Sequence, residues 1–220
     1  MPKTHTVKQG EYISSIARQY GFTDYRKIWD DPQNATLKSK RKNPNVLFPG
    51  DELIIPDRET KEVSGSTEKR HRFQVSLPRL KLRLVLEDLY EKPIANAKCL
   101  LRVDGQEYEL TTNGIGKIEQ LIPATAEAAQ LIIQDPQTPL QDLVVPIKIG
   151  HLDPIDELSG QLARLNNLGY NAGPLPDNSD ADNKNMLQSA VEEFQCDHSL
   201  SVDGVCGSNT QTKLLEAHGC

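Results

Sequence analysis

The reactive side chains of this 220-residue chain are scattered along its length. Five histidines occur, at His5, His71, His151, His198 and His218. Two of them lie near another reactive group, in His151-Leu152-Asp153 and in Cys196-Asp197-His198. A nucleophile and its base usually converge from separate elements, so sequence neighbours seldom form a catalytic pair. We therefore expect no catalysis at Cys196 or His198, and interpret them as the exposed end of a helix.

Paired carboxylates could in principle cleave a glycan. They occur at Asp30-Asp31, Asp156-Glu157 and Glu192-Glu193. A glycosidase needs two carboxylates across a cleft, separated by roughly 5 to 9.5 Å. Adjacent residues on a helix point to different sides. The pairs are therefore interpreted as solvated surface, and the sequence predicts a protein that is not an enzyme.

The pattern of possible metal ligands fits no common site. Cys99, Cys196, Cys206 and Cys220 form no CxxC pair, so a zinc site is not expected. Free thiols in a reducing space are the favoured interpretation, and a Cys196–Cys206 bridge stays open for an oxidising one. A calcium loop starting at Asp180 would need Gly at Asn185 and Glu at Val191, so that pattern fails. We expect no metal and no other cofactor.

Composition excludes further classes. The formal net charge of −6 argues against general nucleic-acid binding, and no apolar run is long enough for membrane insertion. Met1–His5 shows no hydrophobic signal region, so a cytoplasmic protein is expected unless a secretion machine delivers it to the periplasm or outside. The length suits two or three small domains.

The first 56 residues predict a strand, a helix, a turn and a second strand. His5–Glu11 reads as a strand with a glycine turn, and Tyr12–Gly21 has apolar residues at helical spacing. Pro49-Gly50-Asp51 predicts a tight turn into the strand Leu53–Ile55. This order, with V-x-x-G-E, S-I-A and L-x-P-G-D, resembles a LysM domain, a β-α-α-β module that binds glycans.

The LysM resemblance implies a glycan groove between two turns. Its candidate residues are Gly10, Glu11 and Tyr12 on one side, and Leu47, Phe48 and Pro49 on the other. Tyr12 and Phe48 could equally be core residues. The insert with Lys38, Lys40, Arg41 and Lys42 could meet an anionic partner, but a plain solvated loop is slightly favoured.

The middle of the chain predicts strands. Residues 58–78 are mostly charged or small and are interpreted as a linker. Near its end, Phe73, Val75 and Leu77 alternate with polar residues, which is typical of a strand. Alternation from Leu80 to Leu86 predicts a strand with one buried face. Five more strands are expected at residues 97–103, 108–112, 117–121, 130–133 and 143–149. Leu86-x-Asp88, Lys92-Pro93-Ile94 and Thr112-Asn113 resemble a transthyretin-like β-sandwich, which implies a spacer.

Three helices are expected after residue 150. Leucines from Leu158 to Leu168, then Leu187 to Phe194, then Leu214 and Leu215 carry the apolar faces, and Ser208 has the spacing of a capping box. Together with Leu200-x-Val202-Asp203-Gly204, this arrangement resembles the three-helix peptidoglycan-binding domain. The resemblance implies a cleft near Tyr170, Asp203 and Gly204, although a turn-holding role is favoured for Asp203.

The sequence thus predicts an α+β protein of several domains: a LysM domain at 1–57, a linker at 58–78, a β-sandwich at 79–150 and a helical domain at 151–220. We expect it to bind peptidoglycan without cleaving it. The domain order resembles bacterial proteins associated with type VI or other contractile secretion systems. The alternative is an adaptor that docks on a secretion spike or an effector protein.

Overall fold

The computed structural model describes residues 2–58, 62, 64–72, 79–88, 90, 92–134, 142–174 and 181–220, without the side chains of 181–183. The predicted alternation at Phe73, Val75 and Leu77 and part of the predicted loop from Asn171 to Asp182 lie outside these residues. The chain forms two compact units. One comprises Met1–His5, Ile13–Asn34 and Ile54–Gly150, and the other comprises Thr6–Tyr12, Ala35–Leu53 and His151–Cys220. The protein mixes helices and sheets, so the predicted α+β class is confirmed.

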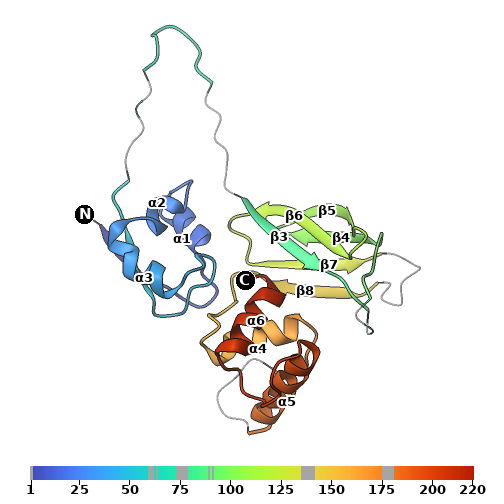
Figure 1. Ribbon diagram of the computed structural model, residues 1–220. Helices are drawn as coiled ribbons and strands as arrows, with labels where there is room; N and C mark the ends of the chain where they lie inside the picture. The colour runs from blue at the N-terminus through green and yellow to red at the C-terminus, as the bar shows by residue number, and fades with distance from the viewer. Residues whose placement is uncertain are drawn as a thin grey trace. The chain divides into compact units, whose positions relative to one another are not determined.

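Short helices separate the two N-terminal strands (Figure 1). The elements are β1 (Lys3–Thr6), α1 (Ile13–Gln19), α2 (Arg26–Trp29), the 3₁₀ turn η1 (Pro32–Asn34), α3 (Ala35–Lys40) and β2 (Glu52–Ile55), and β1 pairs with β2. Helix α1 buries Ile13, Ile16 and Ala17, as its spacing predicts. The basic insert, expected to be a loop, forms α3 through Lys40.

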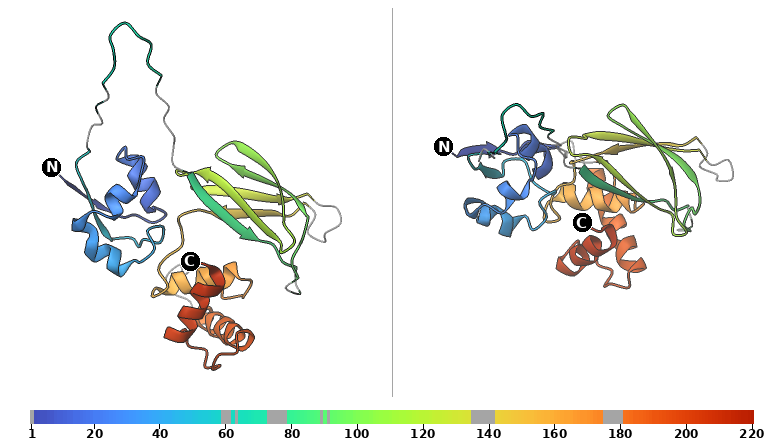
Figure 2. Two further views of the ribbon diagram at one scale, coloured as in Figure 1. Left: turned by 45° about the horizontal axis from the view of Figure 1, so that its top comes forward. Right: turned by 90° about the horizontal axis from the view of Figure 1, so that it is seen from above.

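Two antiparallel sheets follow and share one hydrophobic core. Strands β3 (Arg79–Val85) and β6 (Lys117–Pro123) form one sheet, and β4 (Lys98–Val103), β5 (Gln106–Thr111), β7 (Ala128–Ile133) and β8 (Val144–Lys148) form the other in the order β5-β4-β7-β8. Figure 2 shows these strands from two further sides. All six strand predictions are confirmed to within two residues at each end.

The predicted buried face of β3 points into this core. Leu80, Leu82 and Leu84 are half-buried and pack against it, while the intervening residues are exposed. Half-burial is what a strand paired on one side by β6 allows, with Leu84 directly opposite Ile118. The rest of the core is built mainly by β4 and β7, whose buried residues include Leu101 and Leu131.

The C-terminal helices are α4 (Leu158–Asn167), α5 (Ala181–Asp197) and α6 (Ser208–His218). They surround a core of buried residues: Leu162, Leu165, Ala172, Ala190, Val191, Phe194 and Leu214. The capping box predicted at Ser208 is wrong. Gly207 is the N-cap, without a side-chain bond, and Gln211 donates to the Cys206 carbonyl oxygen instead.

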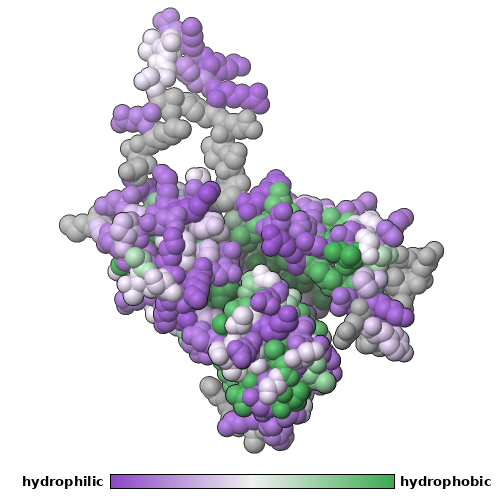
Figure 3. Space-filling model, viewed as in Figure 1, coloured by the Kyte–Doolittle hydropathy of each residue, from purple (hydrophilic) through white to green (hydrophobic). Residues whose placement is uncertain are grey.

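Hydrophobic side chains reach the surface in several places. The space-filling view shows them over the strands and over the C-terminal helices (Figure 3). Val202 and Val205, on the turn that carries Asp203, are 55% and 62% exposed. Among the described residues, no helix combines the length and apolar character needed to span a membrane. The same residues hold no group of three or more His, Cys, Asp or Glu side chains placed to bind a metal ion.

Candidate functional site

The first candidate turn, at residues 8–11, is closed by two hydrogen bonds. The Glu11 amide donates to the Lys8 carbonyl oxygen at 3.1 Å, and the Lys8 amide donates to Glu11 Oε2 at 2.9 Å. Gly10 sits at φ +86°, in the left-handed region that disfavours any residue with a Cβ. The sequence V-x-x-G-E therefore fixes the turn, and the Glu11 carboxylate helps to hold it.

The second candidate turn, at residues 48–51, starts beside the first. The Val7 amide donates to the Asp51 carbonyl oxygen and the Gly50 amide to the Val7 carbonyl oxygen, each at 2.9 Å. The Phe48 amide donates to Asp51 Oδ2 at 2.9 Å, which closes the turn from within. The structure thus joins the two halves of the predicted groove through the backbone of Val7.

The six predicted groove residues divide into two groups. Tyr12 and Leu47 are core residues, with only 2% and 4% of their surface exposed. Gly10, Glu11, Phe48 and Pro49 are partly exposed and lie on the two turns. For Tyr12, the structure favours the core over the groove. Phe48 stays half-buried, with Arg41 over its ring, and the glycan role of these positions stays a prediction.

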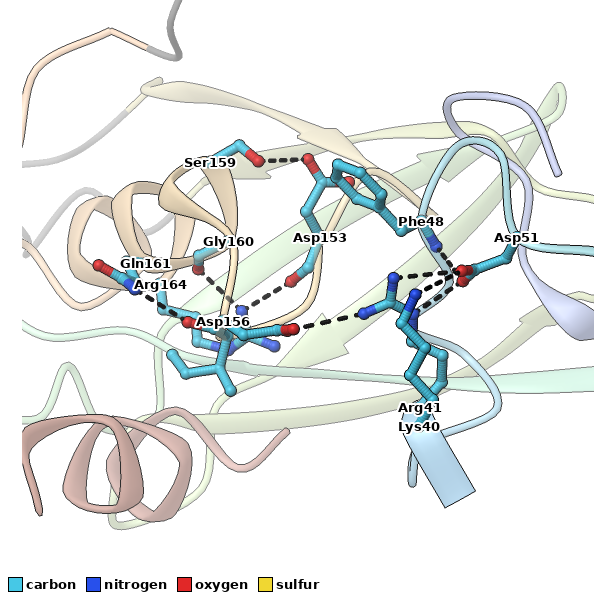
Figure 4. Close-up of polar contacts among 11 residues, drawn as sticks. Lys40, Arg41, Phe48, Asp51, Asp153, Asp156, Ser159, Gly160, Gln161 and Arg164 are labelled. Atoms are coloured by element: carbon cyan, nitrogen blue, oxygen red, sulfur yellow. Dashed lines mark hydrogen bonds and ion pairs between the residues drawn. The ribbon is translucent and has the colours of Figure 1, made fainter. Parts of the chain in front are cut away.

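A buried ion pair supports the second turn. Arg41 Nε donates to Asp51 Oδ2 at 2.8 Å and Arg41 Nη2 to Asp51 Oδ1 at 3.1 Å, with side chains only 2% and 5% exposed (Figure 4). The Arg41 guanidinium carbon lies 5.6 Å from the centroid of the Phe48 ring. Burial is the largest single effect and lowers the pKa of Arg41, but the hydrogen bonds and charge of Asp51, together with the charges of Asp156 and Glu157, raise this pKa overall.

The interpretation of the basic insert as a solvated loop is wrong for Arg41. Lys42 is exposed and Lys40 reaches Asp51 only at 3.7 Å, but Arg41 is a buried partner of the turn. Sequence reasoning missed this pair because four basic residues in a short stretch look alike. The one available signal was Asp51 directly after Pro49-Gly50, a position from which a carboxylate can hold a turn and then needs a cation once buried.

The C-terminal candidate turn is organised by a buried glutamine. Gln195, only 1% exposed, donates from Nε2 to Asp203 Oδ1 at 2.8 Å and accepts at Oε1 from the amides of Asp203 and Gly204. Asp203 Oδ1 also accepts from the Val205 amide at 2.9 Å. The bond from Gln195, followed by that from Val205, lowers the pKa of Asp203. The favoured turn-holding role of Asp203 is confirmed, and Gly204 supplies φ +67°.

Tyr170 is held near the C-terminal end of helix α5. Its hydroxyl donates to Asp197 Oδ2 at 3.1 Å, and its ring meets the Phe194 ring edge-on at 5.4 Å between centroids. Tyr170 and the Asp203 turn are held by different residues of helix α5. Both are fastened to α5, Tyr170 through Phe194 and Asp197, and Asp203 through Gln195.

The thiols and imidazoles are arranged differently from the close sequence pairs. The four cysteines are thiols and do not form disulfides, and burial raises the pKa of Cys206 to about 11. The His198 ring packs on Phe194 at 4.3 Å between centroids. His218 Nδ1 lies 3.3 Å from Cys220 Sγ, a contact of a half-buried imidazole that sequence reasoning did not anticipate.

Two family models match separate parts of the chain. Residues 5–56 match the LysM domain, and residues 163–214 match the peptidoglycan binding domain PG_binding_1. The chain carries a LysM domain and a peptidoglycan-binding domain. The LysM match spans both candidate turns, and the other spans Tyr170 and the Asp203 turn. Neither a curated protein nor a solved structure matched the chain. Together the two domains support peptidoglycan binding.

Proposed function

We propose that this protein binds peptidoglycan without cleaving it, through its LysM domain and its peptidoglycan-binding domain. The observation that carries this proposal is the presence of both domain types, at residues 5–56 and 163–214, on one chain. Gly10, Glu11, Phe48 and Pro49 are the accessible candidates for sugar contact in the first domain. Tyr170 and the Asp203–Gly204 turn are those of the second.

Two weak sites on one chain bind a repeating polymer more tightly than either alone. Once one domain is bound, the other searches a small volume around it, and the apparent affinity rises by about 10² to 10⁴ if both can engage. Peptidoglycan repeats its disaccharide and peptide units, so it offers neighbouring sites. The sheets between the domains then act as a spacer.

The local chemistry supports binding over cleavage. The raised pKa of Cys206 keeps its thiol protonated near neutral pH, which makes it a poor nucleophile. Glu192 Oε1 accepts from Gln188 Nε2 at 2.9 Å, and Asp31 Oδ1 accepts from the Gln33 amide at 2.9 Å. One carboxylate in each of these two acidic pairs therefore serves local structure, which favours a structural over a catalytic role for it.

The test is sedimentation of the full chain with purified insoluble peptidoglycan. Phe48→Ala should reduce the bound fraction, whereas Tyr90→Ala, at an aromatic that is 81% exposed on the strand region, should not. Release of soluble muropeptides is measured in the same tubes. Release that one point substitution abolishes would show that the protein is an enzyme, and absence of sedimentation would refute binding.

The second candidate function is an adaptor accessory to a type VI or phage-tail-like secretion machine, which would also deliver the protein from the cytoplasm. The favouring observation is that Tyr12 is buried and Asp203 Oδ1 is bound within its own turn, which leaves fewer polar groups to meet a sugar. Burial of Leu47 also removes one apolar contact. Affinity capture from the host lysate, run beside the sedimentation, tests this. Capture of a spike or effector protein without any wall binding would favour the adaptor.

A further inference from the structure

The segment His151–Glu157, which we name the acidic joint, is fastened to helix α4. Ser159 Oγ donates to Asp153 Oδ2 at 2.6 Å, and Arg164 Nη1 donates to the Asp153 carbonyl oxygen at 2.8 Å (Figure 4). Gln161 Nε2 donates to the Ile155 carbonyl oxygen at 3.1 Å. These bonds fix both the backbone and one carboxylate oxygen of the joint.

The other side of the acidic joint meets the LysM turns within the same compact unit. Gln9 Nε2 lies 3.4 Å from Asp153 Oδ1, and Arg41 Nη1 lies 3.6 Å from Asp156 Oδ1. The His151 ring lies directly over Gly10, where an added Cβ would come within 2.9 Å of His151 Cε1. The joint therefore touches the first turn at Gly10 and the support of the second turn at Arg41.

The charges on the two sides are complementary. Arg41 is buried, and its Nη1 makes no hydrogen bond within the described part of the chain, although Nε and Nη2 are satisfied by Asp51. That nitrogen points to Asp156, whose side chain is 64% exposed (Figure 4). Asp156 and Glu157 both act to raise the pKa of Arg41, after the stronger effects of burial and Asp51. The partner that suits this nitrogen, which can only donate, is therefore an anionic group.

We propose that the acidic joint is an intrachain ligand of the LysM face formed by residues 8–11, residues 48–51 and Arg41, and that its docking closes this face. The claim that the closed face is a glycan site rests on the proposed function. The anionic partner sought for the basic insert is then Asp156 of the same chain.

The contact is suited to reversible closure. Ion pairs with one exposed member shift an equilibrium only by a factor of about two to five, and the 3.4 Å and 3.6 Å contacts are long. The joint keeps its own shape when it leaves, because Ser159, Gln161 and Arg164 hold it on α4. If the face is closed nine-tenths of the time, by way of example, its apparent affinity for glycan falls about tenfold.

The test reverses the charge that faces Arg41. Asp156→Arg in the full chain replaces attraction by repulsion, and Glu193→Arg, at an exposed position on α5, is the matched control. Amide resonances of Gly10 and Gln9 report docking, and titration with a soluble N-acetylglucosamine oligomer reports access to the face. We expect Asp156→Arg to shift these resonances and raise the affinity about three- to tenfold, with the control unchanged.

The other outcomes separate the docking contact from the glycan site. Unshifted Gly10 and Gln9 resonances in Asp156→Arg would overturn docking of the joint. Shifted resonances with unchanged or weaker affinity would overturn closure. If the resonances shift but neither the wild type nor Asp156→Arg binds the oligomer, the proposed glycan function of this face is refuted, and with it the closure of a glycan site. Docking of the joint would still stand in that case.

Discussion

Gly160 in helix α4 marks the place where the acidic joint crosses the helix. A Cβ added there would overlap the Pro154 carbonyl oxygen and lie 2.6 Å from the Asp153 carbonyl oxygen. Both obstacles are backbone atoms, so no side chain can rotate away. The substitution Gly160→Ala therefore forces the joint away from the helix, or the helix out of its packing against α6.

The expected cost follows from three opposing effects. Overpacking costs about 1 to 3 kcal/mol. Displacing the Asp153 carbonyl from the Arg164 guanidinium, 1% exposed and 2.8 Å away, costs about 1.5 kcal/mol more. Alanine gains about 1 kcal/mol over glycine in helix propensity. The net destabilisation of the helical region is therefore about 1.5 to 3.5 kcal/mol, which for a module of this size lowers the melting temperature by about 6 °C or more.

Urea unfolding combined with hydrogen exchange of peptides from α4 measures this effect. Gly207→Ala is the control, because no heavy atom lies within 4 Å of the added Cβ and the N-cap change costs under about 1 kcal/mol. If Gly160→Ala were as stable as the wild type, or more so through its helix propensity, the joint would not lie over α4 as described.

Three further predictions concern other parts of the molecule. Leu84→Asp places a carboxylate against the sheet core and should cost about 2 kcal/mol or more in urea unfolding, whereas Arg83→Ala, on the exposed side of the strand, should cost under about 1 kcal/mol. Alkylation near pH 8, read by mass spectrometry, should label exposed Cys196 well before Cys206, whose pKa is about 11; equal rates would contradict its burial. Burial, aided by the charge of Arg164, lowers the pKa of His218 below 6.5. As pH falls, the unfolded chain therefore takes up this proton before the folded chain does, and the helical region should lose stability between pH 6.5 and the folded pKa. NMR titration of His218 measures the pKa, and urea unfolding at two pH values measures the loss of stability.

Local features of the structure were predictable from sequence. The buried face of α1, the six strands and the turn role of Asp203 depend on neighbours a few residues away, and periodicity or turn chemistry reveals them. The capping box failed for a related reason. Helix α6 begins at Ser208 itself, the residue expected to be its cap, so the N-cap is Gly207, one residue earlier. Helix boundaries depend on packing as well as on local pattern.

Buried charge and long-range contact were not predictable. Arg41 and Arg164 are the two buried arginines in the part of the chain that the structure describes, and composition gives no means of separating them from the exposed basic side chains. Each is stabilised by oxygen atoms that only the folded chain brings near, Asp51 for the first and the Asp153 carbonyl for the second. Asp153 and Gln9 are 144 residues apart, so no local pattern could have paired them.

Closure and avidity make opposite demands on the LysM face. Docking of the acidic joint and binding of glycan exclude each other there, so closure lowers the affinity for any single sugar chain, by about tenfold if the face is closed nine-tenths of the time. Engagement of both domains on one polymer can raise the apparent affinity by a factor of about 10² to 10⁴. The gain in affinity from avidity is larger than the loss from closure, so insoluble peptidoglycan should open the face where a short soluble oligomer does not. Asp156→Arg should therefore improve binding to the oligomer much more than binding to insoluble wall, and an equal improvement for both ligands would mean that only one domain engages.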